Sequence, residues 1–248
     1  MSFGMEIFSS SGVLIADANL VGFFCRKSVS TTTTLGAGGG NTVPSMVSIP
    51  VTGLGYTYPI IAISSGAYFA KSGYSTGGDA NFICSEGPGT SLNYYIFDWA
   101  PDIPSSPFGI EMFNSAGQRT FSSNFFPMQG LSILSSGSFT STGRTLAAGL
   151  SALGGFRRAG PIDYYSGGAQ VIPEGPGSYD STGYQNFSDL YGARITNSGQ
   201  TVEYGNVSFD NVYIGPEPGD IIPPPDWEVI SSVIAIDVTN IPLNTTFF

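Results

Sequence analysis

The chain has 248 residues, with 8 Lys or Arg, 18 Asp or Glu and no histidine, and its formal net charge is −10. The lack of histidine excludes Ser–His–Asp and Cys–His nucleophile pairs and His-ligated metals, and two cysteines cannot form a four-cysteine metal site within one chain. Eight basic residues are too few for binding to duplex nucleic acid, which depends on neutralising phosphates. A hydrophobic fraction of 41% with many aromatic residues indicates a folded chain rather than a disordered one.

The sequence predicts neither membrane insertion nor secretion. It has no run of 18 uninterrupted apolar residues, and the residues after Met1 have neither the basic region nor the long apolar region of a secretory signal. We therefore expect synthesis in a reducing cytosol. Free thiols at Cys25 and Cys84 are then the expectation, rather than a disulfide.

An internal repeat is the most informative feature of the sequence. Residues 3–12 read FGMEIFSSSG and residues 108–117 read FGIEMFNSAG, with Phe, Gly, Glu, Phe, Ser and Gly in identical places. Each copy alternates as a strand does, reaches a serine-containing turn that ends in glycine, and continues into a second strand. The repeat predicts the same β-hairpin twice, about one domain length apart. The alternative is a chance match between common turn sequences.

Short strands account for most of the remaining chain. They are rich in β-branched and aromatic residues and are bounded by Gly, Pro, Ser or Asn. The strands expected from this pattern cover residues 46–52, 58–64, 67–70, 81–84, 92–99, 130–134, 168–172, 192–196, 200–204, 206–214 and 229–239.

Other segments predict loops, linkers or a helix. The low-complexity residues 28–42 and 72–78 are expected to form exposed loops, and residues 144–153 have the composition of a short helix. Prolines 101–107 read as a linker and prolines 216–225 as a semi-rigid spacer. The strand after this spacer either reaches another subunit or the other domain, or stays within its own domain.

These elements predict an all-β protein of two related β-sandwich-like domains that arose by internal duplication. The expected boundaries are residues 1–106 and 107–248, and the second domain has extended loops and the proline-rich segment.

Candidate chemistry is sparse. Asp98 and Asp226 each precede a tryptophan, so they are the best candidates for a glycosidase-like carboxylate pair, but no motif frames them. Asp180 and Asp210 lack calcium-loop spacing and read as ordinary turn residues. We expect no enzyme activity, no catalytic residues, no cofactor and no metal site.

Two features point to binding instead. Seven acidic residues and no basic residue lie between 203 and 237, which fits either a solvated face or a docking surface for a basic partner. Tyrosines interleaved with Ser, Gly and Asn are typical of adaptable binding loops, although half-buried strand aromatics would give the same pattern. The tyrosines of this cluster include Tyr204 and Tyr213. The candidate recognition loop is expected within residues 159–192, with Tyr164, Tyr165, Tyr179, Tyr184 and Tyr191.

The hairpin sequence at residues 3–12 resembles the N-terminus of uncharacterised minor tail proteins of tailed bacteriophages. The resemblance covers about the first twenty residues, together with the β-rich, Gly- and Ser-rich, weakly charged character of the remainder. It implies a structural virion protein at the tail tip or baseplate, in several copies, with other tail proteins as partners and a host surface receptor as a further partner.

Three functions follow as hypotheses. The first is a non-enzymatic structural component of a phage tail tip, which associates through exposed edge strands and extended loops. The second is a receptor- or carbohydrate-binding tail protein that uses the tyrosines. The third is a carboxylate-based glycan depolymerase.

Overall fold

A computed structural model describes residues 6–8, 14–17, 21–35, 45–52, 55–75, 77–99, 108–150, 155–165, 168–171, 182–214, 228–229 and 232–247. Within these ranges the regular structure is antiparallel β-sheet, apart from one short 3₁₀ turn at Asn197–Gly199. The all-β prediction is therefore confirmed. No helix in these ranges is long and apolar enough to cross a membrane.

Both copies of the repeated sequence form the hairpin that was predicted. Strands β1 (Glu6–Phe8) and β2 (Leu14–Asp17) form one two-stranded sheet, and β9 (Glu111–Phe113) and β10 (Arg119–Ser122) form the other. At positions 105 residues apart, the pairing register is the same in the two hairpins, including the bulge in the second strand. The sequence repeat is thus also a structural repeat.

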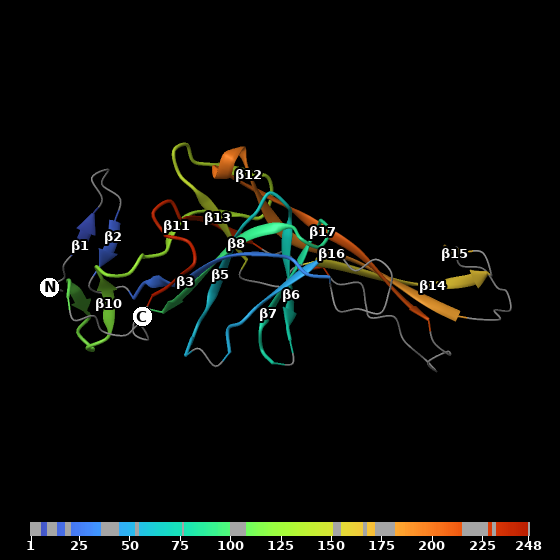
Figure 1. Cartoon of the computed structure of the whole chain (residues 1–248), viewed down its shortest axis with the longest axis horizontal. Coiled ribbons are helices and arrows are strands. Elements are labelled where there is room, and N and C mark those ends of the chain that lie inside the picture. The colour runs from blue at the N-terminus through green and yellow to red at the C-terminus, as the bar shows by residue number, and fades with distance from the viewer. Residues whose placement is uncertain are drawn as a thin grey trace.

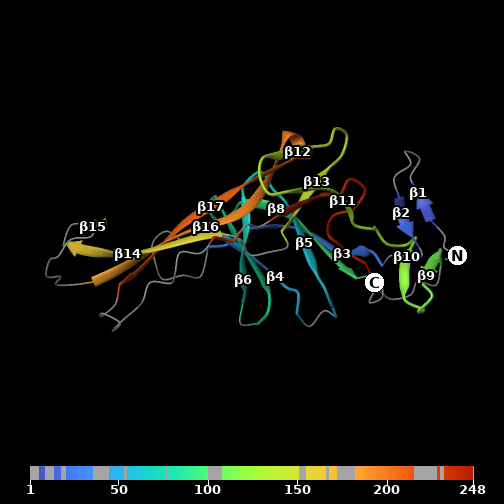
Figure 2. The same ribbon diagram turned by 180° about the vertical axis from the view of Figure 1, so that it is seen from behind.

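The two hairpins pack together at one end of the molecule, as Figures 1 and 2 show. Ile7 of the first hairpin and Met112 of the second occupy equivalent positions and contribute to one small hydrophobic cluster. Phe24, Phe121 and Phe125 complete its buried part. This cluster attaches the hairpin pair to the start of β3.

The first large sheet takes strands from both halves of the chain. Its order is β11 (Gln129–Leu134), β19 (Val233–Asp237), β13 (Leu146–Leu150), β5 (Ile60–Ser64), β8 (Ser91–Trp99), β3 (Phe23–Thr32) and β20 (Thr245–Thr246).

The second large sheet also takes strands from both halves of the chain. Its main order is β12 (Ser138–Thr140), β17 (Thr201–Ile214), β16 (Thr182–Thr196), β6 (Phe69–Tyr74), β7 (Ala80–Cys84) and β4 (Met46–Ile49). Strand β14 (Gly155–Tyr165) pairs with β16, and β15 (Gly168–Val171) and β18 (Glu228–Val229) pair with β14.

The strand orders are symmetric about the junction of the two halves. The first sheet reads β3-β8-β5 and then β13-β19-β11, and the second reads β4-β7-β6 and then β16-β17-β12. Ala62 faces Gly149 where β5 meets β13, and Phe69 faces Ala193 where β6 meets β16. The predicted domain boundary at residues 106 and 107 lies outside the described residues, and both sheets run continuously from one half into the other.

The registers of the first sheet repeat as well. Asp98 on β8 faces Phe24, and Asp237 on β19 faces Gln129, which is 105 residues after Phe24. A bulge follows at the same place in β3 and β11. Asp98 and Asp237 are therefore equivalent positions. The duplication itself remains a prediction, and this correspondence supports it.

The first sheet curls until its two sides meet. The residues just before β11 lie beside the start of β3: the Cys25 N–H donates to the Phe126 carbonyl (2.8 Å) and the Met128 N–H to the Phe23 carbonyl (2.7 Å). Further along, β20 covers the same edge of β3, where the Phe247 N–H donates to the Arg26 carbonyl (2.9 Å). Closure of this kind removes an exposed sheet edge.

Alternation along the strands divides the core into two parts. Ile61, Ile63 and Leu146 point to the cluster between the sheets, whereas Ala62 and Ala147 point to the other face of the first sheet. That face holds a second cluster, with Phe97 and Ile236 among its fully buried members. Strands of the first sheet are thus apolar on both sides, as in a covered sheet.

The helix expected at residues 144–153 is wrong, because residues 146–150 form the fully buried strand β13. Leucine and alanine are good helix formers, but this strand lies in the middle of the first sheet, where tertiary packing overrides propensity. Gly149 allows the close approach of β19: a Cβ at this position would lie 2.9 Å from Cδ1 of Ile236.

The expectation of exposed loops at residues 28–42 and 72–78 is wrong for the parts that lie in strands. Strand β3 continues to Thr32 and β6 to Tyr74. Ser28 in β3 and Thr33 just after it are buried, and their hydroxyls donate to the carbonyls of Pro242 (2.5 Å) and Gly87 (3.2 Å). Hydrogen bonds to backbone satisfy these buried hydroxyls, whereas Ser30 and Thr32 of the same strand are exposed.

The last long strand was expected either to reach another subunit or the other domain, or to stay within its own domain. The structure shows that this strand, β19, stays within its own half of the chain. β19 pairs with β11 and β13, which both belong to residues 107–248. Among the described strands that follow the proline-rich segment, the short β20 pairs with a strand of the first half, β3.

Candidate functional site

The second sheet extends far beyond the first sheet on one side. Residues 182–191 of β16 and 205–214 of β17 continue past the strands that pair at the molecular centre, and β14, β15 and β18 lie alongside them. We call these segments the arm; it projects from the end opposite to the hairpin pair (Figure 1). Ten residues of β-strand span about 33 Å.

Four of the five candidate tyrosines lie in strands of the arm or at its base, rather than in the loop that was expected. Tyr164 and Tyr165 are the last residues of β14, where they pair with the start of β15, and Tyr184 lies in β16. Tyr191 is half-buried at the base, where its ring stacks on Tyr204 with centroids 5.8 Å apart. Tyr179 lies outside the described residues.

The register shows which of these tyrosines share a face. Tyr184 is paired with Pro161 on one side and with Tyr213 on the other. Because alternate residues of a strand share a face, Tyr165 lies on the same face as Pro161, and Tyr164 lies on the opposite face. The arm thus places Tyr165, Tyr184 and Tyr213 on one face. Sequence reasoning did not include Tyr213 among the candidates, because only the pairing of β16 with β17 brings it opposite Tyr184.

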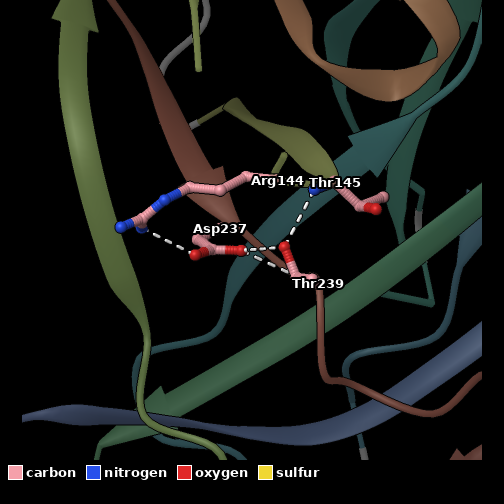
Figure 3. A network of polar contacts seen from close by, with 4 residues as sticks. All are labelled: Arg144, Thr145, Asp237 and Thr239. Atoms are coloured by element: carbon pink, nitrogen blue, oxygen red, sulfur yellow. Dashed lines mark hydrogen bonds and ion pairs between the residues drawn. The ribbon is translucent and has the colours of Figure 1, made fainter. Parts of the chain in front are cut away.

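A polar network lies on the first sheet, near the end of β19 (Figure 3). Nη1 of Arg144 is 2.7 Å from Oδ2 of Asp237. The other carboxylate oxygen accepts hydrogen bonds from the Thr239 hydroxyl (2.6 Å) and N–H (3.0 Å). The Thr239 hydroxyl oxygen in turn accepts from the Thr145 N–H (2.8 Å). The network fixes the chain where it leaves β19.

A small hollow of about 70 Å³ adjoins this network. Its lining residues are Phe126, Pro127, Gln129, Asp237, Thr239, Asn240 and Ile241. Its size suits a few water molecules rather than a substrate.

The equivalent acid in the first half is completely buried. Asp98 has 0% side-chain exposure and lies 3.6 Å from Nη1 of Arg26, and it accepts hydrogen bonds from the N–H groups of Thr57 and Tyr58. A carboxylate enclosed in this way cannot reach a glycan. This burial argues against Asp98 as one acid of a glycosidase pair. Asp226 lies outside the described residues.

Glu203 belongs to a third network, at the base of the arm. Its carboxylate lies 2.8 Å from Nη2 of Arg194 and accepts a hydrogen bond from the Thr196 hydroxyl (2.9 Å). These hydrogen bonds, first that of Arg194, lower the pKa of Glu203. The Arg194 guanidinium also lies over the Tyr68 ring, 4.7 Å from its centroid.

Not every acid of the predicted stretch at residues 203–237 is therefore free to bind a partner. Glu203 and Asp237 each bind an arginine. Asp210 lies in β17 and Glu228 in β18. The other acids of the stretch, Glu217, Asp220 and Asp226, lie outside the described residues.

The hairpin pair exposes large apolar side chains. Phe8 and Phe113, at equivalent positions, are 53% and 49% exposed. Phe108 and Ile110, just before β9, are 81% and 58% exposed. Apolar groups at this end of the molecule, together with the arm at the other end, give two separate surfaces that suit protein contacts.

The described residues contain no group of three or more Cys, Asp or Glu that could hold a metal ion. Cys25 and Cys84 are both buried free thiols, and burial raises the pKa of Cys25 to about 12. Comparisons with protein-family models, with curated proteins and with solved structures find no match for this chain.

Proposed function

We propose that the protein is a non-enzymatic structural component of the tail tip or baseplate of a tailed phage, where it assembles with other tail proteins in several copies. The observation that carries the proposal is the arm, a long antiparallel ladder that leaves the body of the protein. The resemblance of residues 3–12 to minor tail proteins supplies the biological setting.

The arm has apolar residues on both faces. The register places Phe187 and Val212 on one face and Tyr184 and Tyr213 on the other. Apolar residues on a sheet face favour a covering layer on that face. Neighbouring subunits supply such layers in an assembly.

The hairpin pair supports the same proposal from the other end of the molecule. Two copies of one hairpin present the exposed Phe8 and Phe113 at equivalent positions. A subunit with contact surfaces at two ends can link two neighbours, which suits a structural role.

Purified virions test the proposal directly. The protein is expected at a fixed number of copies per particle by quantitative mass spectrometry, and a cryo-EM map of the tail should show the arm covered on both faces. A chain deleted from 156 to 190 with a short glycine replacement should be lost from particles even if it still folds. Absence of the wild-type protein from purified virions would refute the proposal.

A second candidate is receptor or carbohydrate binding by the tyrosine face of the arm. The observation in its favour is the direct pairing of Tyr184 with Tyr213, on the face that also has Tyr165. A double change, Tyr184→Ala with Tyr213→Ala, should reduce binding of the purified protein to host cells. Tyr164→Ala, on the opposite face, is the matched control. Unchanged binding by the double variant would remove this candidate.

We infer further that the chain arose by tandem duplication of a unit with one hairpin and three strands in each large sheet. The symmetric strand orders and the shared bulge positions support this inference. A protease site inserted among residues 101–107 tests whether the two halves hold each other through the shared sheets. After cleavage the halves should remain together on native gel filtration. Separation of the halves would contradict the pairing of β5 with β13 and of β6 with β16.

A further inference from the structure

The C-terminal residues cross from the second half of the chain to the first. Residues 242–247, which we call the strap, follow β19 and lie along the outer edge of β3. The ladder between the strap and β3 has two residue pairs, Thr245 with Ser28 and Thr246 with Lys27. The strap is therefore a short strand at one end of the chain, bound to a strand near the other end.

Polar groups of the strap and of β3 satisfy one another. The Phe247 N–H donates to the Arg26 carbonyl (2.9 Å), and the Ser30 N–H donates to Oδ1 of Asn244 (2.8 Å). The Phe247 ring makes an edge contact with Phe126, at 5.4 Å between centroids. The outer edge of β3 is thus a strand-binding site with a known occupant, the uncharged sequence PLNTTF.

A tight turn joins β19 to the strap. The Ile241 N–H donates to the Val238 carbonyl (3.1 Å), which closes a four-residue turn. Oδ1 of Asp237 accepts from the hydroxyl and N–H of Thr239, and the Thr239 hydroxyl oxygen accepts from the Thr145 N–H (Figure 3). We call this network of Asp237, Thr239 and Thr145 the latch, because it fixes the turn from which the strap begins.

Side-chain packing supports the turn only weakly. Thr239 and Asn240 are exposed, and the hollow of about 70 Å³ is lined by the turn and by Phe126, Pro127 and Gln129. Atoms beside a hollow lack dispersion contacts on that side, so opening the turn loses little packing. The hydrogen bonds of the latch are therefore the main resistance to opening.

An open turn lets the strap reach a second molecule. On that molecule it makes the same contacts with β3 that it makes on its own, so exchange between two copies leaves the set of contacts unchanged. A short tether gives the strap an effective concentration on the order of mM at its own β3. Exchange therefore competes where copies are crowded together to a similar concentration, and more readily where the latch is broken.

We propose that the strap exchanges between copies of this chain. Residues 242–247 of one molecule bind the β3 edge of a second molecule, and the latch holds them on their own molecule until the turn opens. The partner is a second copy, because the edge already binds this sequence. The inference concerns self-association and does not depend on a role in phage tails.

Disulfide trapping between full-length proteins tests the proposal. The Phe247 N–H bonds to Arg26, so the next pair, Thr246 with Lys27, is non-hydrogen-bonded, with Cα atoms about 4.5 Å apart and within disulfide range. One protein carries only Lys27→Cys and the other only Thr246→Cys. A disulfide joins these two proteins only when a strap has crossed to a second copy.

Two mixtures are the controls. Ile133→Cys, at a residue that is 71% exposed on β11, replaces Lys27→Cys to measure random collision. Wild-type protein in the same place accounts for the native cysteines, which are both buried. A single chain with both Lys27→Cys and Thr246→Cys should form the disulfide within one molecule, which shows that the pair can react.

The mixed disulfide is expected to form at least about tenfold faster with Lys27→Cys than in either control mixture. Thr239→Val in both proteins removes the latch hydroxyl and should increase the trapping rate at least about fivefold. Thr239→Ser keeps the hydroxyl and should change the rate less than about twofold. Native mass spectrometry of the wild-type protein should show a dimer that increases as its concentration approaches about 1 mM.

Trapping at the rate of the control mixtures would overturn the proposal if the double-cysteine chain forms its internal disulfide. A wild-type protein that stays monomeric at about 1 mM would also overturn it. An equal trapping rate with Thr239→Val would show that the latch does not hold the strap.

Discussion

Asp98 and Asp237 occupy equivalent positions in the two halves, but their surroundings differ, and this difference predicts unequal stability losses. Asp98 and Arg26 have side-chain exposures of 0% and 10%, whereas Asp237 and Arg144 have 14% and 35%. Asp98→Asn leaves the Arg26 charge buried without its counter-ion, which costs about 3–5 kcal/mol. The lower value applies, because the asparagine carbonyl can still accept from the Tyr58 N–H.

Asp237→Asn is the matched control, since it makes the same chemical change in a more exposed pair. An ion pair with this exposure contributes about 0–1 kcal/mol. For a chain of this size, each kcal/mol shifts the melting temperature by about 2–4 °C. Asp98→Asn should therefore lower it by about 6–12 °C and Asp237→Asn by about 4 °C at most.

The assay is thermal and urea unfolding followed by tryptophan fluorescence. Trp99 is adjacent to Asp98 and makes an edge contact with the Tyr58 ring, at 5.7 Å between centroids, so its emission reports on this part of the fold. Equal losses in the two variants, or a loss below about 1 kcal/mol for Asp98→Asn, would refute the reasoning that burial determines the difference.

Three further predictions concern single residues. Gly192→Ala should destabilise the protein by several kcal/mol in urea unfolding, because its Cβ would overlap the Phe69 carbonyl where β6 meets β16; a near-neutral result would contradict this close approach. Arg194 lowers the pKa of Glu203, so the Glu203 carboxylate contributes its full stabilisation above the ordinary pKa of 4.5 and loses it as pH falls through the lowered pKa of the folded state. Glu203→Gln should therefore flatten the acid part of the curve of unfolding free energy against pH. An unchanged curve would contradict this role of Glu203. Cys25, with a pKa of about 12 and no exposure, should not react with a thiol reagent at pH 8 until the protein unfolds, and rapid labelling of native protein would contradict its burial.

The sequence allowed the hairpins and most strands to be predicted, because their signals are local. In each hairpin, alternation around a glycine-ended turn is sufficient. Strand β3 was missed because its second half is Ser- and Thr-rich, and burial of Ser28 depends on the carbonyl of Pro242, which is distant in sequence. Residues 146–150 have the composition of a helix, but their central place in a sheet, which has no local signal in the sequence, makes them a strand.

The candidate site was less predictable than the fold. Composition indicated tyrosine-rich recognition, but which tyrosines share a face depends on the pairing of β14, β16 and β17. The acidic stretch was visible in the sequence, whereas the arginine partners of Glu203 and Asp237 depend on tertiary structure. Strand pairing over long sequence separation leaves no local signal, so these features require the structure.

The joints at Ala62 with Gly149 and at Phe69 with Ala193 have a consequence for synthesis of the chain. When only the first half has left the ribosome, the edges of β5 and β6 await partners that lie about 80 to 130 residues downstream. At about 5–20 residues per second, that interval lasts several seconds or longer. On a polysome, neighbouring nascent chains expose the same two edges at the same time, and pairing between them would trap unfinished chains in mutual dimers. Efficient production of this protein should therefore depend on ribosome spacing and on chaperones that shield β5 and β6 until the second half arrives.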